Sequence, residues 1–309
     1  MHQSVLLSEV LAGLALQPGA VVVDGTLGGG GHSAALANAV GPQGRVVALD
    51  RDAGALDRAR KNLGDRVDRC TLVQSSFARM DQVVSGLGLS EVDGVLLDIG
   101  ISSDQLDDPD RGFSFMKEGP LDMRMDQQAP ITAAGLLNTL PETDLARLLK
   151  RYGEEPRARA IAQRVVSQRG VVPFRRTTQL ADLVTEVYGG RRGRIHPATL
   201  SFQALRIAVN GELEALEAGL AAGLRILKVG GRMAVITFHS LEDRIVKQFF
   251  VEHQGRMESL PEGGAKWVGA LPKVAILTRK PVVATDAECR GNPRARSAKL
   301  RIAERKEQD

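Results

Sequence analysis

Residues 21–32 read VVVDGTLGGGGH, and this stretch decides the fold. Three β-branched residues form a short strand, and the glycines after Asp24 let the backbone turn tightly where a helix begins. A glycine-rich turn between a strand and a helix presents backbone N–H groups to a nucleotide-like ligand. The alternative is a loop that only needs positive φ, which is the weaker interpretation of four consecutive glycines. The stretch therefore predicts the first strand–turn–helix unit of a cofactor-binding α/β fold.

The alternation of strand and helix continues on the C-terminal side of this unit. Further strands are expected at 46–49, 70–73 and 95–97, with helices at 53–63 and 80–87 between them. Short apolar strands that alternate with helices predict a parallel, doubly wound sheet. A helix over 212–227 and a fifth strand over 232–237 resume the sheet, and 274–277 and 300–302 are shorter candidates to complete it.

Between residues 108 and 210 the sequence has helical patterning and no convincing strand. The expected helices are Glu142–Tyr152, Arg157–Arg169, Thr177–Tyr188 and a segment that starts at Ala198. We therefore expect a first part of the α/β domain at 1–107, an inserted helical domain at 108–210, and a second part of the α/β domain at 211–309.

Polar residues at the ends of the predicted strands indicate which cofactor binds. A dinucleotide fingerprint that started at Gly28 would need Gly or Ala where this chain has Ser33, which disfavours NAD. Asp50 ends the second strand and is the predicted ribose ligand, because Asp52 is better placed to cap the following helix. Phe77 follows the third strand, where it either packs on an adenine ring or belongs to the core.

Asp98 ends the fourth strand directly after the apolar run Val95-Leu96-Leu97. A carboxylate there is costly unless it has a partner, and ligands bind at the carboxyl edge of such sheets. Asp98 is therefore a predicted site residue.

The composition sets outer limits on the function. The chain has 309 residues, 43% hydrophobic and 25% charged, as in soluble globular proteins, and we expect neither export nor membrane insertion. Cys70 and Cys289 have no disulfide or zinc-ligand spacing, and an acid-rich turn at residues 107–110 is explained without a metal, so none is expected. A net charge of +4 is compatible with a polyanionic partner without specifying one.

Blocks of sequence throughout the chain resemble one family, the bacterial 16S ribosomal RNA cytosine-N4 methyltransferases. The first blocks are HQSVLL at 2–7, DGTLGGGGHS at 24–33 and LDIGISSDQLD at 97–107. Those that follow are RGFSF at 111–115, PLDMRMD at 120–126, YGEE at 152–155, HPAT at 196–199 and FQALRIAVN at 202–210. The last two are FHSLEDR at 238–244 and NPRARSAKLR at 292–301. Thr237 and Pro156 depart from the family pattern, both outside the expected cofactor contacts.

The resemblance implies a class I S-adenosylmethionine-dependent methyltransferase, a Rossmann-like fold interrupted by a helical substrate-recognition domain. It implies a cytoplasmic enzyme that methylates a cytidine of the decoding region (P site) in 16S rRNA of the small ribosomal subunit. The sequence leaves a homodimer open as an alternative to a monomer. Carried over by position, the cofactor contacts are Gly30, Gly31, His32, Asp50, Phe77, Asp98 and Gln105.

Methylation of the exocyclic N4 amine needs an acceptor for its proton, and Asp98 or a neighbouring carbonyl is the candidate catalytic group. Many amine methyltransferases place an aromatic residue after Asp-Pro-Pro at this point, whereas this chain continues Asp98-Ile99-Gly100-Ile101. Phe113 or Phe115 is the expected replacement, stacked on the cytosine. Carbon-5 methylation would need a cysteine nucleophile, and neither cysteine is well placed for it.

Several further residues have two interpretations. His239 is either a substrate contact or part of a segment in which Ser240 and Asp243 form a helix capping box. The basic residues either contact phosphates or are solvated; they are Arg175, Arg176, Arg191, Arg192, Arg194, Arg294, Arg296, Lys299 and Arg301. Two other functions stay open: methylation of another nucleic acid or a protein amine, and a non-catalytic RNA-binding assembly factor.

Overall fold

The computed structural model describes residues 4–191, 193, 196–260 and 264–307, and the chain divides into two compact units. Unit 1 comprises Met1–Gly100 and Leu213–Asp309, and unit 2 comprises Ile101–Glu212. The boundaries expected from the sequence follow residues 107 and 210, whereas the observed divisions follow Gly100 and Glu212. The chain leaves unit 1 right after its fourth strand, before the acid-rich turn.

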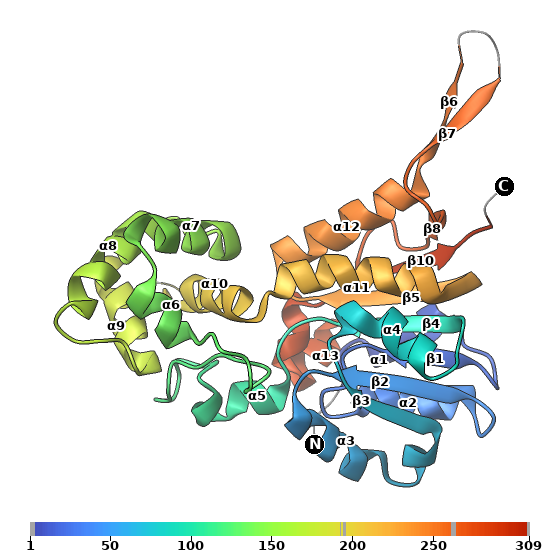
Figure 1. Ribbon diagram of the computed structural model, residues 1–309, viewed down its shortest axis with the longest axis horizontal. Coiled ribbons are helices and arrows are strands. Elements are labelled where there is room, and N and C mark those ends of the chain that lie inside the picture. The colour runs from blue at the N-terminus through green and yellow to red at the C-terminus, as the bar shows by residue number, and fades with distance from the viewer. Residues whose placement is uncertain (1–3, 192, 194–195, 261–263, 308–309) are drawn as a thin grey trace. The chain divides into compact units, whose positions relative to one another are not determined.

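Unit 1 is built on one sheet with the strand order β3-β2-β1-β4-β5-β10-β8 (Figure 1). The strands are β1 (Val21–Asp24), β2 (Arg45–Asp50), β3 (Cys70–Gln74), β4 (Val92–Asp98), β5 (Leu227–Thr237), β8 (Val274–Ile276), β9 (Val282–Val283) and β10 (Lys299–Arg305). Strands β1 to β5 are parallel, and β10 runs antiparallel to β5, β8 and β9. The predicted doubly wound α/β fold is confirmed, with one reversed strand that the pattern did not indicate.

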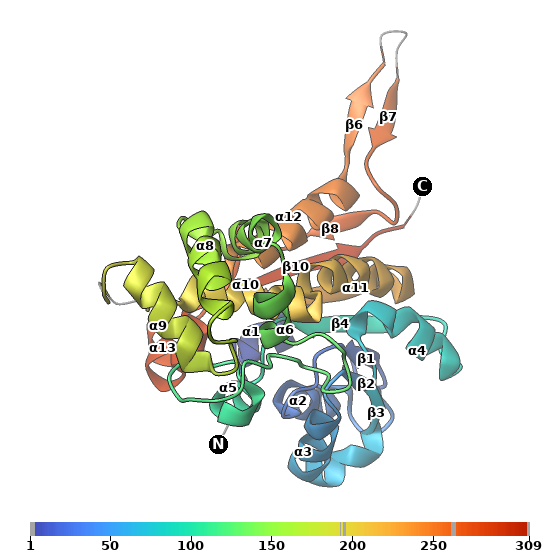
Figure 2. The same ribbon diagram turned by 60° about the vertical axis from the view of Figure 1, so that its left-hand side comes forward.

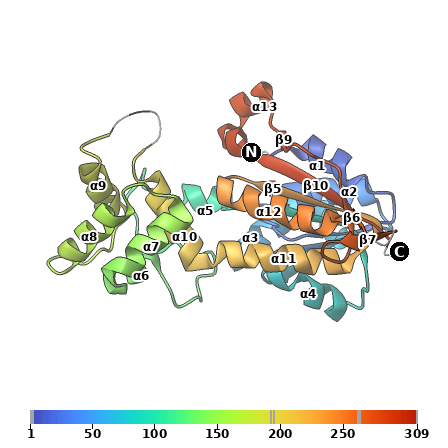
Figure 3. The same ribbon diagram turned by 90° about the horizontal axis from the view of Figure 1, so that it is seen from above.

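Helices cover both faces of this sheet (Figure 3). They are α1 (Leu7–Leu14), α2 (Gly31–Val40), α3 (Ala53–Leu63), α4 (Met80–Gly86), α11 (Glu212–Ile226), α12 (Ser240–Gln254) and α13 (Asp286–Gly291). One core cluster joins the sheet to α1, α2 and α3, and another joins it to α4, α11 and α12. A strand covered on both faces must be apolar throughout, which explains the uninterrupted run that ends at Asp98.

Unit 2 is helical and has its own core. Its helices are α5 (Ser103–Asp107), α6 (Ala133–Thr139), α7 (Glu142–Gly153), α8 (Ala158–Arg169), α9 (Thr177–Val187) and α10 (Thr199–Asn210). In α7 the buried residues Leu145, Leu149 and Gly153 recur every fourth position, which places them on one face of the helix. The four helices expected between 142 and 210 are confirmed, with ends shifted by about one residue, as is usual for boundaries read from sequence.

Two features of the C-terminal part differ from expectation. Strand β5 begins at Leu227 rather than Arg232. Its pairing with β4 shifts register between Val92 and Gly94, so that the strand also includes Gly230 and Gly231. The hairpin of β6 (Arg256–Ser259) and β7 (Ala265–Val268), which projects from unit 1 in Figure 2, was not predicted. Its residues are largely exposed, so no buried face produces an alternating pattern. Among the described residues, no helix is both long and apolar enough to cross a membrane.

The side chain of Arg301 holds α12 against β10. Arg301 is 8% exposed and donates hydrogen bonds to the Asp243 carboxylate from Nε at 2.7 Å and from Nη2 at 3.2 Å. Lys299 Nζ lies 3.5 Å from the same carboxylate, and both bases lower the pKa of Asp243 against the effect of burial. The phosphate contact considered for Arg301 is therefore wrong, since its charge is used inside the fold.

We expect Arg301→Met to lower the free energy of unfolding by about 3 kcal/mol, because it leaves the largely buried Asp243 carboxylate without its main partner. Urea unfolding followed by circular dichroism measures this. Arg296→Met is the control, since Arg296 is exposed in the same segment and should change stability by less than about 0.5 kcal/mol. Equal stabilities of the two variants would contradict the structural role of Arg301.

Candidate active site

The glycine-rich turn after β1 forms one wall of the candidate site. Gly28 and Gly30 have φ values of 49° and 83°, a left-handed conformation that favours glycine. Gly30 is the N-cap of α2, and no side chain of the described residues caps this helix. A Cβ on Gly31, the first residue of α2, would lie 2.2 Å from Ser4 Oγ, so the N-terminal segment packs closely on the turn. The first backbone N–H groups of α2, which no described side chain caps, can therefore bind an anionic or polar ligand group.

Asp24 holds the turn together from inside. Its side chain is fully buried, and it accepts hydrogen bonds from Thr26 N at 3.1 Å and from Ser33 Oγ at 2.6 Å. Thr26 Oγ1 in turn accepts a hydrogen bond from Asp98 N at 2.7 Å. One buried carboxylate thus links the end of β1, the start of α2 and the end of β4.

The Asp50 carboxylate at the end of β2 contacts the same turn. Its Oδ2 accepts from Gly28 N at 2.9 Å, and its Oδ1 accepts from Asp52 N at 2.9 Å. Asp52 itself caps α3 by accepting from Gly54 N, as predicted. Burial raises the pKa of Asp50, and the two backbone donors oppose that rise. Each carboxylate oxygen can accept a second hydrogen bond, so the arrangement fits the predicted contact to ribose hydroxyls.

Asp98 and His32 form the chemically most distinctive pair of the site. Asp98 Oδ2 lies 3.5 Å from His32 Nδ1, and His32 Nε2 lies 3.0 Å from the carbonyl oxygen of Val5. Because a carbonyl oxygen only accepts, Nε2 carries a hydrogen. The close contact of Nδ1 with Oδ2 is then favourable when one of these two atoms carries a proton that the other accepts. Asp98 Oδ1 is buried and has no hydrogen-bond partner among the described residues. Burial raises the pKa of Asp98 to about 6, with His32 lowering it and Asp24 and Glu242 raising it.

Phe77 follows β3 in a short 3₁₀ helix, Phe77–Arg79, on the side of the sheet covered by α11. A Cβ on Gly219 of α11 would lie 2.4 Å from the Phe77 ring, and one on Gly25 would lie 2.9 Å from Phe77 Cβ. The ring is partly buried in the core cluster beside the glycine-rich turn. The packing role is thus present, and the contact with adenine stays a prediction.

The remaining predicted contact and the expected stacking residues lie in unit 2. Gln105 is buried in α5, where it forms a capping box with Ser102. Its role in the structure is thus to cap this helix, and its contact with the cofactor stays a prediction. Phe113 is 6% exposed in the helical core, and the prediction that its ring stacks on a base is wrong. Phe115 is partly buried and stacks on His196, with ring centroids 4.5 Å apart.

The segment after β5 is capped differently from expectation. The capping box of α12 is formed by His239 and Glu242, and not by Ser240 and Asp243. Glu242 is fully buried, and its Oε2 accepts from Phe238 N at 2.8 Å and from His239 N at 3.2 Å. Glu242 was missed because a histidine N-cap is unusual, although the spacing of His239 and Glu242 matches a capping box.

The two cysteines and the acid-rich turn carry no candidate chemistry. Cys70 lies in β3, where burial raises the pKa of its thiol to about 11, and Cys289 lies in α13; both are free. Asp108 caps the short helix Pro109–Arg111 by accepting from Asp110 N at 3.0 Å. No cluster of three potential metal ligands occurs within the described ranges.

The basic residues considered as phosphate contacts do not behave alike. Arg175, Arg176, Arg191 and Arg296 are exposed, and Arg176 Nε lies 3.8 Å from Glu118 Oε1, which is exposed as well. Arg294 is partly buried, and Arg192 and Arg194 lie outside the described residues, as do His2 and Gln3 of the first family block. These four exposed arginines remain candidates for RNA contacts.

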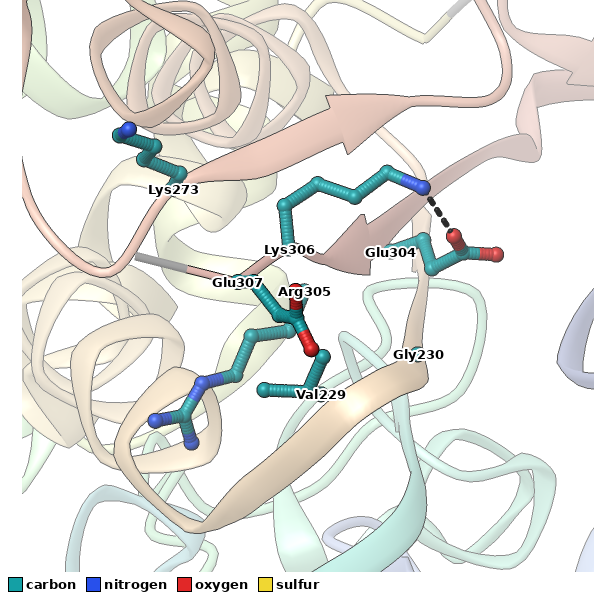
Figure 4. Close-up of a pocket in the computed structure, with 7 residues that line it drawn as sticks. All are labelled: Val229, Gly230, Lys273, Glu304, Arg305, Lys306 and Glu307. Atoms are coloured by element: carbon teal, nitrogen blue, oxygen red, sulfur yellow. Dashed lines mark hydrogen bonds and ion pairs between the residues drawn. The ribbon is translucent and has the colours of Figure 1, made fainter. Parts of the chain in front are cut away.

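A separate pocket lies at the opposite edge of the sheet (Figure 4). Val229 and Gly230, in the amino-terminal half of β5, and the end of β10 line it together with Lys273. Lys306 Nζ donates to Glu304 Oε1 at 2.6 Å inside it. The pocket is thus remote along β5 from Thr237, where the carboxyl edge begins, and is not part of the candidate site.

The carboxyl edge of the sheet therefore combines a glycine-rich turn after β1, acidic residues ending β1, β2 and β4, and a reversed strand β10 beside β5. This combination defines the class I methyltransferase fold. The chain belongs to the MraW methylase family, whose model matches residues 1–306. Membership confirms the predicted methyltransferase class and S-adenosylmethionine as its methyl donor.

Two relatives are close to this chain over nearly its full length. The protein from Heliobacterium modesticaldum is 50% identical over 307 residues, and that from Geobacter sulfurreducens is 49% identical over 306 residues. Each alignment covers 98% of both chains, and each relative is called ribosomal RNA small subunit methyltransferase H. Among solved structures, an rRNA methylase from Streptococcus thermophilus overlaps with a TM-score of 0.43 at 12% identity, covering 99% of both chains.

Asp98 should make stability depend on pH. Its pKa is about 6 in the folded protein and about 3.9 in an unfolded chain. Between about pH 3.9 and pH 6 the folded state therefore binds more protons than the unfolded state, and the free energy of unfolding falls as the pH rises through this range. We expect Asp98→Asn to raise the melting temperature at pH 7.5 and to change it little at pH 4. Calorimetry without cofactor measures the melting temperatures, and exposed Asp65→Asn is the control. If Asp98→Asn did not raise the melting temperature at pH 7.5, the ionised Asp98 carboxylate would not destabilise the folded protein.

Gly219 gives a test of Phe77 as part of the cofactor wall. We expect Gly219→Ala to weaken S-adenosylmethionine binding, because the added Cβ would push the Phe77 ring from a position only 2.4 Å away. Isothermal titration calorimetry measures the dissociation constant. Gly86→Ala is the matched control, since a Cβ there meets no atom within 4 Å. If the folded Gly219→Ala protein bound the cofactor as wild type does, Phe77 would be a core residue only.

Proposed function

We propose that this protein transfers the methyl group of S-adenosylmethionine to the exocyclic N4 amine of a cytidine in 16S rRNA, in the decoding region (P site) of the small ribosomal subunit. The names of its relatives support ribosomal RNA of the small subunit as the substrate. An enzyme with this substrate would act in the cytoplasm, where ribosomes assemble. The observation that most supports an amine as the group that receives the methyl is Asp98 Oδ1, which lies buried and without a hydrogen-bond partner among the described residues at the carboxyl edge.

The residues present fit the cofactor. The uncapped start of α2 offers backbone donors, Asp50 offers lone pairs for the ribose, and Phe77 lies beside the turn. When bound, S-adenosylmethionine supplies an electrophilic methyl group on a positively charged sulfur. Asp24 and Asp98 add negative charge around this place, which favours a cation there.

Asp98 can do the proton chemistry that N4 methylation requires. The amine lone pair is delocalised into the cytosine ring, and a hydrogen bond from the N–H to Asp98 Oδ1 favours the pyramidal nitrogen that can attack. As the new N–C bond forms and the C–S bond breaks, the nitrogen becomes positively charged and gives up one proton. Asp98 accepts it, and His32 Nδ1 lies 3.5 Å from the other carboxylate oxygen to orient the group. No covalent intermediate with the protein is involved.

Unit 2 is the proposed substrate-recognition part. Phe115 of this unit is partly exposed and stacks on His196, and the exposed Arg175 and Arg191 can engage phosphates. The same cofactor site would also serve methylation of another nucleic acid or a protein amine, and a non-catalytic assembly factor would bind RNA without turnover. These two are the competing outcomes of the test below.

We expect the protein to transfer labelled methyl groups to small ribosomal subunits that lack this modification, and to yield N4-methylcytidine in their RNA. Asp98→Ala should lower kcat at least about 100-fold, because it removes the proton acceptor. The acid limb of the pH–rate profile should lie at or below about pH 6, since the bound sulfonium lowers the pKa of Asp98 from its value in the free enzyme.

Nucleoside mass spectrometry of the digested RNA makes this measurement, and exposed Asp65→Asn is the matched control. Methylation of a different nucleoside or of a ribosomal protein would move the assignment to another acceptor. Cofactor binding without any transfer would favour the non-catalytic function.

A further inference from the structure

Phe238 is an aromatic residue at the carboxyl edge that is not among the site residues expected from the sequence. It is the first residue after β5, and it is partly exposed while packing against the core cluster of α1, α2 and α3. Its ring lies against the backbone of Gly100: a Cβ on Gly100 would be 3.5 Å from Phe238 Cδ2 and 4.0 Å from Cε2.

The sheet register explains this contact. Asp98 of β4 pairs with Ile236 of β5, and Ile99 N donates to Ile236 O at 2.9 Å. Two residues further along each strand, Gly100 and Phe238 therefore lie side by side. Gly100 has a φ of 125°, so another residue there would be strained and would direct its side chain at the ring. The Phe238 ring thus lies over the chain two residues beyond Asp98.

The backbone of Phe238 is fixed by a buried group. Its N–H donates to Glu242 Oε2 at 2.8 Å, and the same oxygen accepts from His239 N. Because Glu242 is fully buried in the capping box of α12, the start of this helix determines where the ring lies. The ring is thus held by the fold before any ligand binds.

The place that Phe238 occupies is one where an aromatic group is needed. After Asp98 this chain has Ile99-Gly100-Ile101, without the aromatic residue that amine methyltransferases often carry there, and Phe113 lies in the core of unit 2. An aromatic face beside the proton acceptor can stack on a flat base and aim its exocyclic amine at Asp98.

We propose that Phe238, supplied by β5 instead of β4, is the platform on which the target cytosine stacks. The inference rests on the proposed function and deepens it, because it names the residue that positions the base. Phe238 acts through the face of its ring, so an aliphatic side chain of similar size cannot replace it, whereas tyrosine can.

The test compares Phe238→Leu and Phe238→Tyr in methylation of unmodified small ribosomal subunits. We expect Phe238→Leu to lower kcat/KM about 10- to 100-fold, the range of one lost base–aromatic stack, and to leave the cofactor dissociation constant unchanged. Phe238→Tyr should keep most of the activity. Phe249→Leu is the matched control, since Phe249 is a partly buried aromatic of α12 whose ring lies 4.1 Å from His253.

Three results would overturn the proposal. In the first, Phe238→Leu is as active as Phe249→Leu; in the second, Phe238→Tyr loses as much activity as Phe238→Leu, which indicates a packing role alone. Either of these, with an active wild-type enzyme, leaves the proposed function intact. If the wild-type enzyme methylates no cytidine in the subunits, the proposed function fails first and the platform fails with it.

Discussion

The hydrogen bonds around the buried carboxylate of Asp24 are the constraint on which the site depends. A fully buried charge is tolerated only with close donors, and here Thr26 N and Ser33 Oγ supply them. Because Ser33 lies in the first turns of α2 and Thr26 also receives the N–H of Asp98, these bonds fix three elements at once. The glycine-rich turn has its shape because it must close over this carboxylate, and the ends of β1 and β4 stay in register beside it.

The strand order places the other groups at the same edge. The sheet reverses its winding at β1, which has β2 on one side and β4 on the other, and ligands bind at such a point. Asp50 at the end of β2 contacts Gly28 of the turn, and β5 carries Phe238 to Gly100 beyond the end of β4. Residues far apart in sequence thus meet because parallel strands all end at one edge. The antiparallel β10 completes the sheet, with Arg301 holding α12 in place behind Phe238.

Much of this fold could be predicted from the sequence, and the exceptions have physical reasons. A strand covered on both faces has a buried apolar run, such as Val95-Leu96-Leu97 in β4, so its pattern is clear and the acidic residue that ends it stands out. The hairpin β6–β7 has no buried face and gave no signal. Phe113 and Phe115 look equivalent in RGFSF, and only the packing of unit 2 separates a core ring from a partly exposed one. Phe238 could not be found because its role depends on the register between two strands separated by the helical unit.

The carboxylates at the carboxyl edge destabilise the empty protein and at the same time favour binding of the methyl donor. Asp98 has one buried, unpartnered oxygen, and Asp24 and Glu242 raise its pKa further, so its ionised form is unfavourable while the site is empty. A positive charge beside these carboxylates reduces that cost, and methyl transfer removes the positive charge from sulfur. The same cluster therefore favours the charged methyl donor over its neutral product. A site arranged in this way spends part of the stability of the fold to bind the donor and release the product, a trade-off that functional sites commonly show.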